Sequence, residues 1–363
     1  MLISHKLIIG FVASITLPIL IISLLLISKI QQQTLQSTQT SIEREVSQID
    51  NAIHLFFLEI EKNVKYLSRH KKVIAGKSKL ATYTSNNDSV LMTPLQNSSV
   101  EKELYQLFTD FGDSHDGIAY IYLGNEQAGY LQWPNGKIGK SYDPRIRPWY
   151  QTGITENGEI KRTQAYYFAS DDAVIISTVK AFQDSQGTNL GVIGMDVSLG
   201  GLSEIVKKIK LGESGYLMLI EDSGTILVDP KNAENNFVSF TEAQQGLFKP
   251  LADISSGQVE LDINGESYFA NVYTSSHLGW KFVGLLKASE VLASANEMTS
   301  RIIFLSIILV LLFSSGAVYL SRLISTPIVK VTNGLERISK GDGDLTQRLN
   351  INAKDETGKL ADN

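Results

Sequence analysis

The segment Tyr142–Tyr150, with the sequence YDPRIRPWY, combines residue types and spacing that could bind a small molecule. Its two prolines restrict their own φ angles and favour extended backbone at the residues before them, so we expect a stiff loop. Arg147 can hold a carboxylate through two parallel hydrogen bonds, and Trp149 and Tyr150 can add apolar walls with a polar rim. The segment therefore predicts a clamp for a carboxylate.

The same segment also permits a purely structural interpretation. Trp149 and Tyr150 are aromatic residues of the kind that fill protein cores. Arg147 would then pair with Asp143 or Asp172 and pin the loop. Residue chemistry alone leaves both interpretations open.

Asp196 lies in an otherwise apolar run, 191–197, where a buried carboxylate is costly unless a cation meets it. An ammonium group on a ligand would be such a cation. Arg147 and Asp196 together therefore predict a site for a zwitterion, with the two charges facing each other across one small cavity. The alternative is that Asp196 ends its strand and caps the helix that begins near Ser198.

Two groups of short aliphatic and aromatic runs, bounded by Gly, Asn and Asp, predict strands. The first group is 117–123, 128–133, 173–182 and 190–199, and the second is 216–220, 225–228, 259–263, 267–273 and 280–286. From Val100 onward the periodicity is that of strands rather than helices, and a helix over 199–209 joins the two groups. We therefore predict an α+β fold with a first module at 76–199 and a second module at 200–295, each built on an antiparallel sheet.

A long amphipathic helix is expected over 29–75. Its apolar residues recur at steps of four and three, namely Ile42, Val46, Ile49, Ile53, Phe56, Ile60, Val64 and Leu67. This stripe can pack along its own modules, pair with a second copy of the chain, or do both over different lengths. A homodimer is the assembly that we expect.

Two stretches without charged residues, 7–28 and 302–321, are long enough to cross about 30 Å of hydrocarbon. The first is expected to be an uncleaved anchor rather than a secretory signal, because its apolar core is long and no small-residue cleavage site follows Ser28. Lys6 and Arg322 lie beside the short ends, which predicts that 1–6 and 322–363 are cytoplasmic and that 29–301 lies outside.

Composition excludes several classes of function. The chain has 33 Lys and Arg against 38 Asp and Glu, a net charge of −5, so no electrostatic footprint for nucleic acid is present. It has no cysteine, which rules out disulfides, thiol nucleophiles and thiolate metal sites. Its five histidines lack metal-ligand spacing, and we find no nucleophile elbow or phosphate-binding glycine loop. We therefore expect no enzyme activity, no metal, no cofactor and no nucleic-acid partner.

The order of span, long helix, two sheets and second span, with YDPRIRPWY at 142–150 and GVIGMDVSL at 191–199, resembles the double-Cache ectodomain of bacterial methyl-accepting chemotaxis receptors. The resemblance covers about residues 30–300. It implies two tandem PAS-like modules, of which the first is membrane-distal and the second membrane-proximal. Because the second module lacks an equivalent Arg-x-Trp-Tyr segment, we expect it to transmit a signal without binding a ligand.

The amino-acid-sensing branch of that family has a Tyr, an Arg five residues later, a Trp-Tyr pair two residues after the Arg, and a later Asp. The matching positions here are Tyr142, Arg147, Trp149, Tyr150 and Asp196. By this resemblance Arg147 and Trp149 take the α-carboxylate of the ligand. The two tyrosines and Asp196 surround its ammonium group.

Tyr166 is a further expected pocket residue, and here the chain departs from the family. Many members carry an acidic residue two positions later, where this chain has Phe168. The departure weakens the second contact to the ammonium group and leaves the ligand's exact class open, although Asp171 or Asp172 could replace that contact.

Residues 322–363 resemble a HAMP linker, with an apolar helix after Pro327, a connector at Gly341–Leu345 and a second helix opening at Asp355–Gly358. The apolar positions of the first helix are Ile328, Val331, Leu335 and Ile338. The resemblance implies a parallel four-helix coiled coil formed by two chains. A plain juxtamembrane amphipathic helix is the alternative.

Together these features lead us to expect a chemoreceptor of the bacterial inner membrane that senses an extracellular amino acid or related zwitterion. Its partners would be the small-molecule ligand, a second copy, membrane lipid and, through an output domain that these 363 residues do not contain, a cytoplasmic adaptor and kinase. Alternatives are the input half of a sensor histidine kinase or cyclic-dinucleotide enzyme, a receptor for amines or other small carboxylates, and a membrane binding protein without signalling output.

Overall fold

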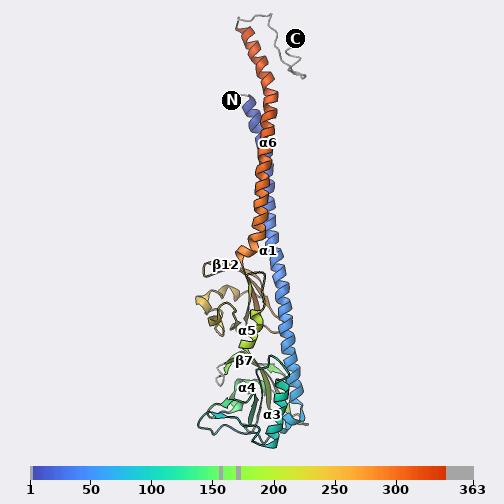
Figure 1. The fold of residues 1–363 in the computed structure, drawn as a ribbon, viewed down its shortest axis with the longest axis vertical. Coiled ribbons are helices and arrows are strands. Elements are labelled where there is room, and N and C mark those ends of the chain that lie inside the picture. Colours follow the sequence, from blue (N-terminus) through green and yellow to red (C-terminus); the bar gives the residue numbers. More distant parts are fainter. Residues whose placement is uncertain (1–2, 155–157, 169–172, 341–363) are drawn as a thin grey trace. The chain divides into compact units, whose positions relative to one another are not determined.

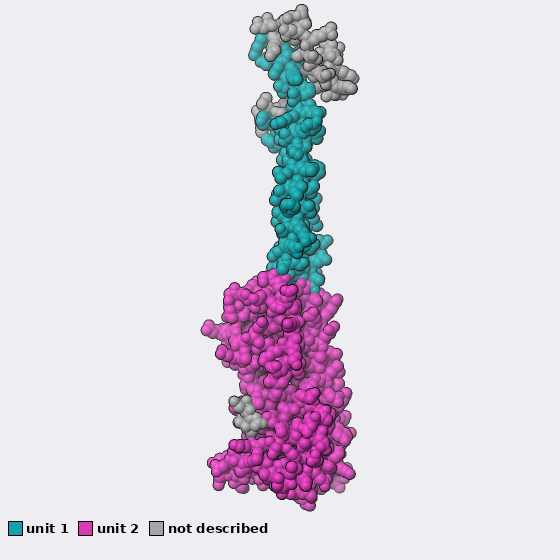
Figure 2. Space-filling model, viewed as in Figure 1, with its two compact units in different colours: residues 1–37, 291–363 teal, residues 38–290 magenta. Residues whose placement is uncertain are grey.

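The computed structural model of the chain describes residues 3–154, 158–168 and 173–340. It consists of two compact units, one formed by residues 1–37 and 291–363 and the other by residues 38–290 (Figure 2). Two long helices, α1 (Ile3–Ser68) and α6 (Ala288–Ser339), contribute to both units. The predicted connector at Gly341–Leu345 and the second HAMP helix at Asp355–Gly358 lie outside the described residues.

The smaller unit is made of the two apolar helix segments. Both α1 and α6 are long and apolar enough to cross a membrane, as the sequence predicted. Within this unit the hydroxyl oxygens of Ser23 on α1 and Ser306 on α6 are 2.7 Å apart and share a hydrogen bond. Helix α6 continues through Pro327 without interruption.

The first module of the larger unit is a six-stranded antiparallel sheet with helices on both faces (Figure 1). Its strands are β2 (Tyr120–Asn125), β3 (Tyr130–Trp133), β5 (Lys161–Arg162), β6 (Tyr166–Phe168), β7 (Ala173–Gln183) and β8 (Asn189–Ser198). The order is β3-β2-β8-β7-β5, with β6 also pairing with β7. A separate two-stranded ribbon consists of β1 (Val90–Leu91) and β4 (Lys137–Ile138).

Two helices of the first module were not expected from the sequence. Helix α3 (Ser99–Gly112) falls where we expected strand-like periodicity. It begins at the N-cap Ser98, whose hydroxyl accepts a hydrogen bond from the backbone N–H of Glu101, and it buries Leu104 and Phe108. Ser98 and Glu101 have the spacing of a capping box, but the Glu101 carboxylate accepts from Ala81 and Asn97 instead of Ser98. The buried Leu104 and Phe108 recur at helical spacing. The second is the short α4 (Pro148–Gly153), described with the site below.

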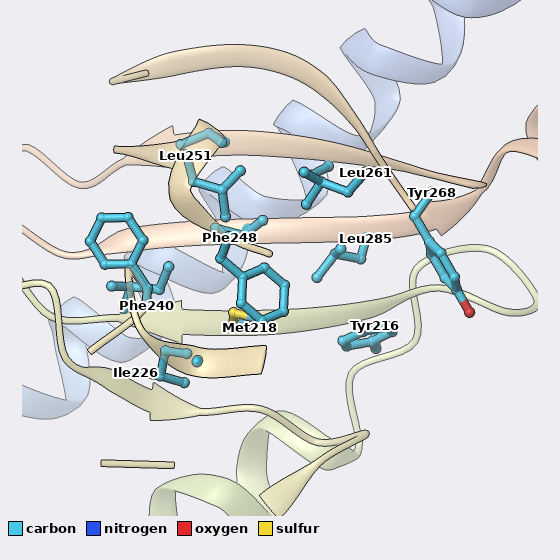
Figure 3. Packing of buried hydrophobic residues seen from close by; sticks show 14 residues of the cluster. Tyr216, Met218, Ile226, Phe240, Phe248, Leu251, Leu261, Tyr268 and Leu285 are labelled. Carbon is cyan, nitrogen blue, oxygen red and sulfur yellow. The ribbon is translucent and has the colours of Figure 1, made fainter. Parts of the chain in front are cut away.

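The second module is a five-stranded antiparallel sheet with the order β10-β9-β13-β12-β11. Its strands are β9 (Tyr216–Ile220), β10 (Ile226–Val228), β11 (Ser256–Ile263), β12 (Glu266–Thr274) and β13 (Lys281–Lys287). The helix α5 (Leu199–Lys207) follows β8 directly and connects the modules, as predicted. Figure 3 shows the core on one sheet face, where Phe248 from a loop lies beside Met218 and Leu285.

Helix α1 covers the other face of the second sheet. A Cβ added to Gly284 of β13 would lie 2.9 Å from Ile42 and 3.5 Å from Val46, so helix and sheet approach each other closely at this glycine. Six residues of the predicted stripe are buried, namely Ile42, Val46, Ile53, Ile60, Val64 and Leu67. The predicted Ile49 and Phe56 are only half-buried, and Phe57 is buried in place of Phe56. The helix ends at Ser68 rather than near residue 75, because His70 accepts a hydrogen bond from Lys72 and starts the separate helix α2 (Lys71–Ala75).

Candidate ligand-binding site in the first module

The backbone of Tyr142–Tyr150 is set by its two prolines. Asp143 and Arg147, which precede them, are both extended, with ψ angles of 115° and 148°. Each proline then opens a short helix, η1 (Pro144–Ile146) and α4, because a proline suits the first position of a helix. The expected stiff loop is therefore a pair of short helices, separated by the single extended residue Arg147.

The aromatic residues of this segment are buried in one cluster on the face of the sheet opposite α3. Trp149 is in contact with Tyr150, with ring centroids 5.5 Å apart, and with Tyr122 of β2 at 4.7 Å. Tyr142 packs on Tyr130 of β3 at 4.8 Å. All five rings are buried. The structural interpretation of Trp149 and Tyr150 thus agrees with their burial, and burial in this cluster also places them beside the other predicted site residues.

Two glycines of the sheet make room for this cluster. A Cβ on Gly124 of β2 would lie 2.7 Å from the Trp149 ring and 2.9 Å from Pro144. A Cβ on Gly194 of β8 would lie 2.5 Å from the hydroxyl oxygen of Tyr122. Real Cβ atoms do not approach other atoms so closely, so both positions require glycine for the short helices and Tyr122 to lie against the strands.

Arg147 lies at the edge of the cluster. Its guanidinium carbon is 4.4 Å from the centroid of the Tyr142 ring, a cation–π contact. Within the described ranges its Nε is buried without a hydrogen-bond partner, and the guanidinium makes no ion pair. Asp143, one of the two partners considered from the sequence, pairs instead with Arg145 at 2.7 Å. The other, Asp172, lies outside the described residues.

Asp196 is buried in β8 with 3% of its surface exposed, and it is held by two hydroxyl groups. The hydroxyls of Tyr122 and Ser177 each donate a hydrogen bond of 2.6 Å to its Oδ1. The hydroxyls of Ser177 and Tyr166 share a further hydrogen bond of 2.8 Å. These contacts place Tyr166 and Asp196 in one polar network.

Helix capping by Asp196 does not occur. The N-cap of α5 is Ser198, whose hydroxyl accepts a hydrogen bond from the N–H of Gly201 at 3.0 Å. Asp196 lies two residues earlier in the strand and faces the tyrosine cluster. The capping alternative is therefore wrong.

The electrostatics of the network centre on the buried carboxylate. Burial raises the pKa of Asp196 to about 7, although the hydrogen bonds from Ser177 and Tyr122 oppose this rise. Burial likewise raises the pKa of Tyr122 and of Tyr166, with the charge of Asp196 as the second cause in both. The carboxyl group thus titrates near neutral pH, and a cation placed beside it would favour its ionised form.

Tyr142 lies close enough to Arg147 and Asp196 for both charges to act on its hydroxyl. Burial is the main cause that raises the pKa of its hydroxyl; Arg147 lowers that pKa and Asp196 raises it further. The Tyr142 hydroxyl therefore lies in the field of both the cation and the carboxylate. The structure brings all six predicted site residues, Tyr142, Arg147, Trp149, Tyr150, Tyr166 and Asp196, to this face of one sheet. The cavity between them stays a prediction.

Phe168, which replaces the acidic residue common in the family, makes an edge-on contact with Tyr120 at 5.2 Å between ring centroids. Tyr120 is opposite Asp196 in the register of β2 and β8, so it lies on the same face as the polar network. An apolar contact thus occupies the expected place of the second carboxylate. Asp171 and Asp172 lie outside the described residues.

Tyr122 and Ser177, the two residues that hold Asp196, were not predicted from the sequence. Ser177 is a register partner of Asp196 on the neighbouring strand, and Tyr122 lies two residues from Tyr120 on the same face of β2. A polar residue inside an apolar strand is a signal for Ser177. Its pairing with Asp196 needed the strand register, which the sequence does not contain.

Comparison with known proteins agrees with this architecture. Residues 26–295 match the Cache domain, and residues 319–363 match the HAMP domain. Methyl-accepting chemotaxis protein McpB of Bacillus subtilis is 27% identical over 365 residues, which cover 99% of this chain and 50% of that protein. The chain therefore spans half the length of this relative.

Two solved structures have the fold of the larger unit. The ligand-binding domain of Mlp24 with asparagine has a TM-score of 0.56 at 21% identity, covering 74% of this chain and 99% of that one. The ligand-binding domain of the Pseudomonas fluorescens chemoreceptor CtaA with L-isoleucine has a TM-score of 0.56 at 18% identity, covering 73% and 98%. The family matches confirm the double-Cache and HAMP resemblance. The chain therefore belongs to the Cache-domain family, joins its Cache domain to a HAMP domain, and is similar in sequence to methyl-accepting chemotaxis proteins.

Proposed function

We propose that the protein is a transmembrane chemoreceptor whose first module binds an amino acid or a related zwitterion. The observation that carries the proposal is the placement of two charged groups around one tyrosine, Tyr142, on one face of the first sheet. These groups are the buried carboxylate of Asp196 and the guanidinium of Arg147, which has no ion-pair partner among the described residues. The asparagine and isoleucine bound by the two proteins of similar fold support the same class of ligand.

Arg147 and Trp149 take the ligand carboxylate. The Nε of Arg147 is buried without a partner in the described part of the chain, and a carboxylate satisfies a guanidinium edge with two parallel hydrogen bonds. The Trp149 ring is buried in the same aromatic cluster and limits the access of water to the bound carboxylate. A buried donor without a partner is costly, so binding gains the free energy of satisfying it.

Asp196 takes the ligand ammonium group, with Tyr142, Tyr150 and Tyr166 around it. Its Oδ1 is already held by two hydroxyl donors, which orients the carboxylate. The contact between Phe168 and Tyr120 supplies an apolar wall where many family members have a second carboxylate. We therefore expect one ammonium contact rather than two, which favours amino acids over diamines.

Binding produces a signal only if the ligand has different affinities for two arrangements of the receptor. We place the chain as a homodimer in the bacterial inner membrane, surrounded by lipid, with the larger unit in the periplasm. The signal passes along α6 into the HAMP domain and from there, through an output domain, to a cytoplasmic adaptor and kinase. In this role the chain is a receptor rather than an enzyme.

A ligand screen tests the proposal. The chain of residues 1–363, reconstituted in lipid nanodiscs, is exposed to each standard L-amino acid, to amines and to small carboxylates. Binding is measured as a shift in unfolding temperature and by calorimetry. We expect at least one amino acid to bind, and neither the matching amine nor the matching carboxylic acid to bind as tightly.

Variants separate the site from the fold. Arg147→Ala and Asp196→Asn should each weaken binding about a hundredfold or more, because each leaves one charge of the ligand without its partner. The matched control is Asp143→Asn, which removes an ion pair in the same segment but touches no proposed ligand group. Normal binding of the amino acid by either site variant contradicts the zwitterion clamp. If only amines bind the natural sequence, Arg147 has a structural role and does not bind ligand.

A further inference from the structure

A short segment of the first module, residues 161–168, reaches both the second module and α1. It contains the edge strands β5 and β6, which pair with β7. Between these strands the backbone N–H of Ala165 donates a 2.8 Å hydrogen bond to Oε1 of Glu221, which directly follows β9 in the second module. This bond joins the backbone of the first module to a side chain of the second.

Glu221 is placed for this contact by its own hairpin. It is buried, with 4% of its surface exposed, at the turn between β9 and β10. Its Oε2 accepts a 2.7 Å hydrogen bond from the hydroxyl of Ser223, while its backbone N–H donates to the carbonyl of Thr225 at 2.8 Å. One carboxylate oxygen is thus held by the second module, and the other is free to hold Ala165.

Arg162 makes a second connection from the same segment. Its guanidinium carbon lies 4.6 Å from the ring centroid of Phe57 on α1, and Nη2 lies 3.5 Å from Oε1 of Glu61 on the same helix. Phe57 also contacts Trp280, which precedes β13 of the second module, at 5.5 Å between ring centroids. The Phe57 ring therefore has the first module on one side and the second on the other.

The charges at this junction are mutually dependent. Burial raises the pKa of Glu221, and hydrogen bonds from Ser223 and Ala165 oppose that rise. Burial lowers the pKa of Arg162, which the charges of Glu61, Asp222 and Glu221 oppose. Removing one charged side chain of this buried group leaves the opposite charges without a partner. We therefore expect the contacts of the junction to form or break together.

The other end of the segment is part of the candidate ligand site. Tyr166 directly follows Ala165, and its hydroxyl shares a hydrogen bond with Ser177, which donates to Asp196. A ligand that displaces Tyr166 or draws it inward shifts the peptide group between Ala165 and Tyr166. The N–H bound by Glu221 belongs to the preceding peptide group, between Gln164 and Ala165, which is joined to it through the Ala165 Cα.

We propose that the hydrogen bond from Ala165 to Glu221, with Arg162 on Phe57 beside it, couples the ligand site of the first module to the second module. Glu221 is a positioning residue in this scheme, since it acts through Ala165 and Tyr166 and touches no ligand. The proposal rests on ligand binding in the first module. The hydrogen bond between Ala165 and Glu221 is either formed or broken, and the position of Tyr166 shifts the equilibrium between these two states.

The signal could instead pass between the modules along the continuous backbone. Strand β8, which carries Asp196, continues directly into α5 and so into the second module. If the signal passes this way, changes at Glu221 leave the response of the second module intact. The two routes therefore predict different results for the same variant.

The test uses the chain in lipid nanodiscs with L-asparagine as the probe and hydrogen exchange, followed by mass spectrometry, as the readout. In the natural sequence we expect L-asparagine to change exchange both in β7 and β8 and in the hairpin 216–228. Glu221→Asp shortens the side chain by one methylene and withdraws it from Ala165 while retaining the charge. In this variant the change in β7 and β8 should persist and the change in 216–228 should be lost.

Two further variants control for damage to the fold. Glu221→Gln keeps an acceptor for Ala165 and should restore the response of 216–228. Ser223→Ala removes a hydrogen bond of the same carboxylate but not the one between modules, and it should also retain the response. An undiminished response of 216–228 in Glu221→Asp, or no rescue by Glu221→Gln, overturns the proposal.

Failure of the proposed function has a different signature. If L-asparagine alters exchange nowhere, that ligand is wrong, and Tyr166→Phe then serves as the perturbation of the segment. This variant should change exchange in 216–228 when Glu221 is present and leave it unchanged on the Glu221→Asp background. Equal effects on both backgrounds overturn the coupling, whatever the ligand proves to be.

Discussion

Ser177 and Asp196 are register partners on β7 and β8, and the Ser177 hydroxyl donates a 2.6 Å hydrogen bond to Oδ1 of the carboxyl group. Tyr122, from the strand on the other side of β8, donates to the same oxygen at the same distance. The carboxyl group is therefore oriented by both neighbouring strands. A binding group that is oriented in advance loses little entropy when the ligand arrives.

The affinity for an amino acid should rise with pH up to neutrality. Burial raises the pKa of Asp196 to about 7, so below that pH the free protein carries a neutral carboxyl group there. The ligand ammonium favours the carboxylate, so binding under acidic conditions must release a proton. We expect the dissociation constant to fall about tenfold per pH unit from about pH 5 to about pH 7 and then to level off.

Calorimetry in buffers with different ionisation enthalpies measures this proton release directly. About one proton should be released per ligand at pH 6 and almost none at pH 8. In Asp196→Asn the remaining weak binding should lose this pH dependence. A dissociation constant that is flat across the range, or one that rises with pH, would show that no ammonium group meets Asp196.

Ser177→Ala should move the pH dependence upward. The Ser177 hydroxyl donates to the carboxylate and so lowers the pKa of Asp196. A hydrogen bond to a charged group contributes about 1.5 kcal/mol, and its loss should raise the midpoint of the affinity curve by about one pH unit. The measurement is the same titration of affinity against pH.

Thr178→Val is the matched control. Thr178 is the next residue of β7 and is equally buried, but within the described residues its hydroxyl has no hydrogen-bond partner. This substitution removes a hydroxyl without removing a hydrogen bond, so the midpoint should stay in place and stability should not fall. An equal shift in both variants would mean that packing in β7, rather than the hydrogen bond to Asp196, sets the midpoint.

Gly124→Ala should displace the short helices from the sheet. The added Cβ meets the Trp149 ring at 2.7 Å and Pro144 at 2.9 Å, and neither is the end of a flexible side chain. Overpacking of this kind costs about 1–3 kcal/mol of stability, and here it also moves a proposed binding residue. Thermal unfolding and ligand affinity should therefore both decrease.

Gly139→Ala provides the comparison, because a Cβ at that position meets nothing within 4 Å. We expect its unfolding temperature and its affinity to match those of the natural sequence or to exceed them slightly. If Gly124→Ala binds ligand as tightly as Gly139→Ala, the position of Trp149 is not part of the recognition.

The strands and the site differ in how far the sequence could predict them. The predicted strand at 216–220 has the same bounds as β9 in the structure. Such strands can be predicted from local composition because their residues must fit a buried pleated surface. Helix α3 was not predicted, although its N-cap Ser98 and the four-residue spacing of its buried Leu104 and Phe108 are both local helix signals.

Strand register explains what the sequence could not provide. Arg147 and Asp196 were identified from their residue types and from family resemblance, but the holders of the carboxylate, Ser177 and Tyr122, become neighbours only when β7 and β2 pair with β8. A shift of one residue would turn both side chains to the opposite face. Contacts that depend on the pairing of distant strands therefore cannot be predicted from composition or spacing.

Glu290 should fasten the start of α6 to the second module. Its carboxylate accepts hydrogen bonds from the backbone N–H of Glu213 at 2.8 Å and of Ser214 at 2.9 Å, and from the Ser214 hydroxyl. Partial burial raises the pKa of Glu290, but the hydrogen bonds from Ser214 and Glu213 outweigh it and the pKa lies below its ordinary value. The stabilisation is therefore present above the ordinary glutamate pKa and is lost as pH falls through the lowered one.

Glu290→Ala removes all three acceptor contacts and should cost about 1–3 kcal/mol, with faster hydrogen exchange at Glu213 and Ser214. Glu297→Ala, which breaks only the exposed i,i+4 pair with Arg301 on the same helix, should cost about 0.5 kcal/mol or less and leave that exchange unchanged. Because α6 leads from the second module into the second span, Glu290→Ala should also abolish any ligand-induced change in exchange along 291–301 while ligand affinity stays within a few-fold. Retention of that change would mean that α6 is driven through its backbone connection to β13 alone, with the carboxylate contributing only stability.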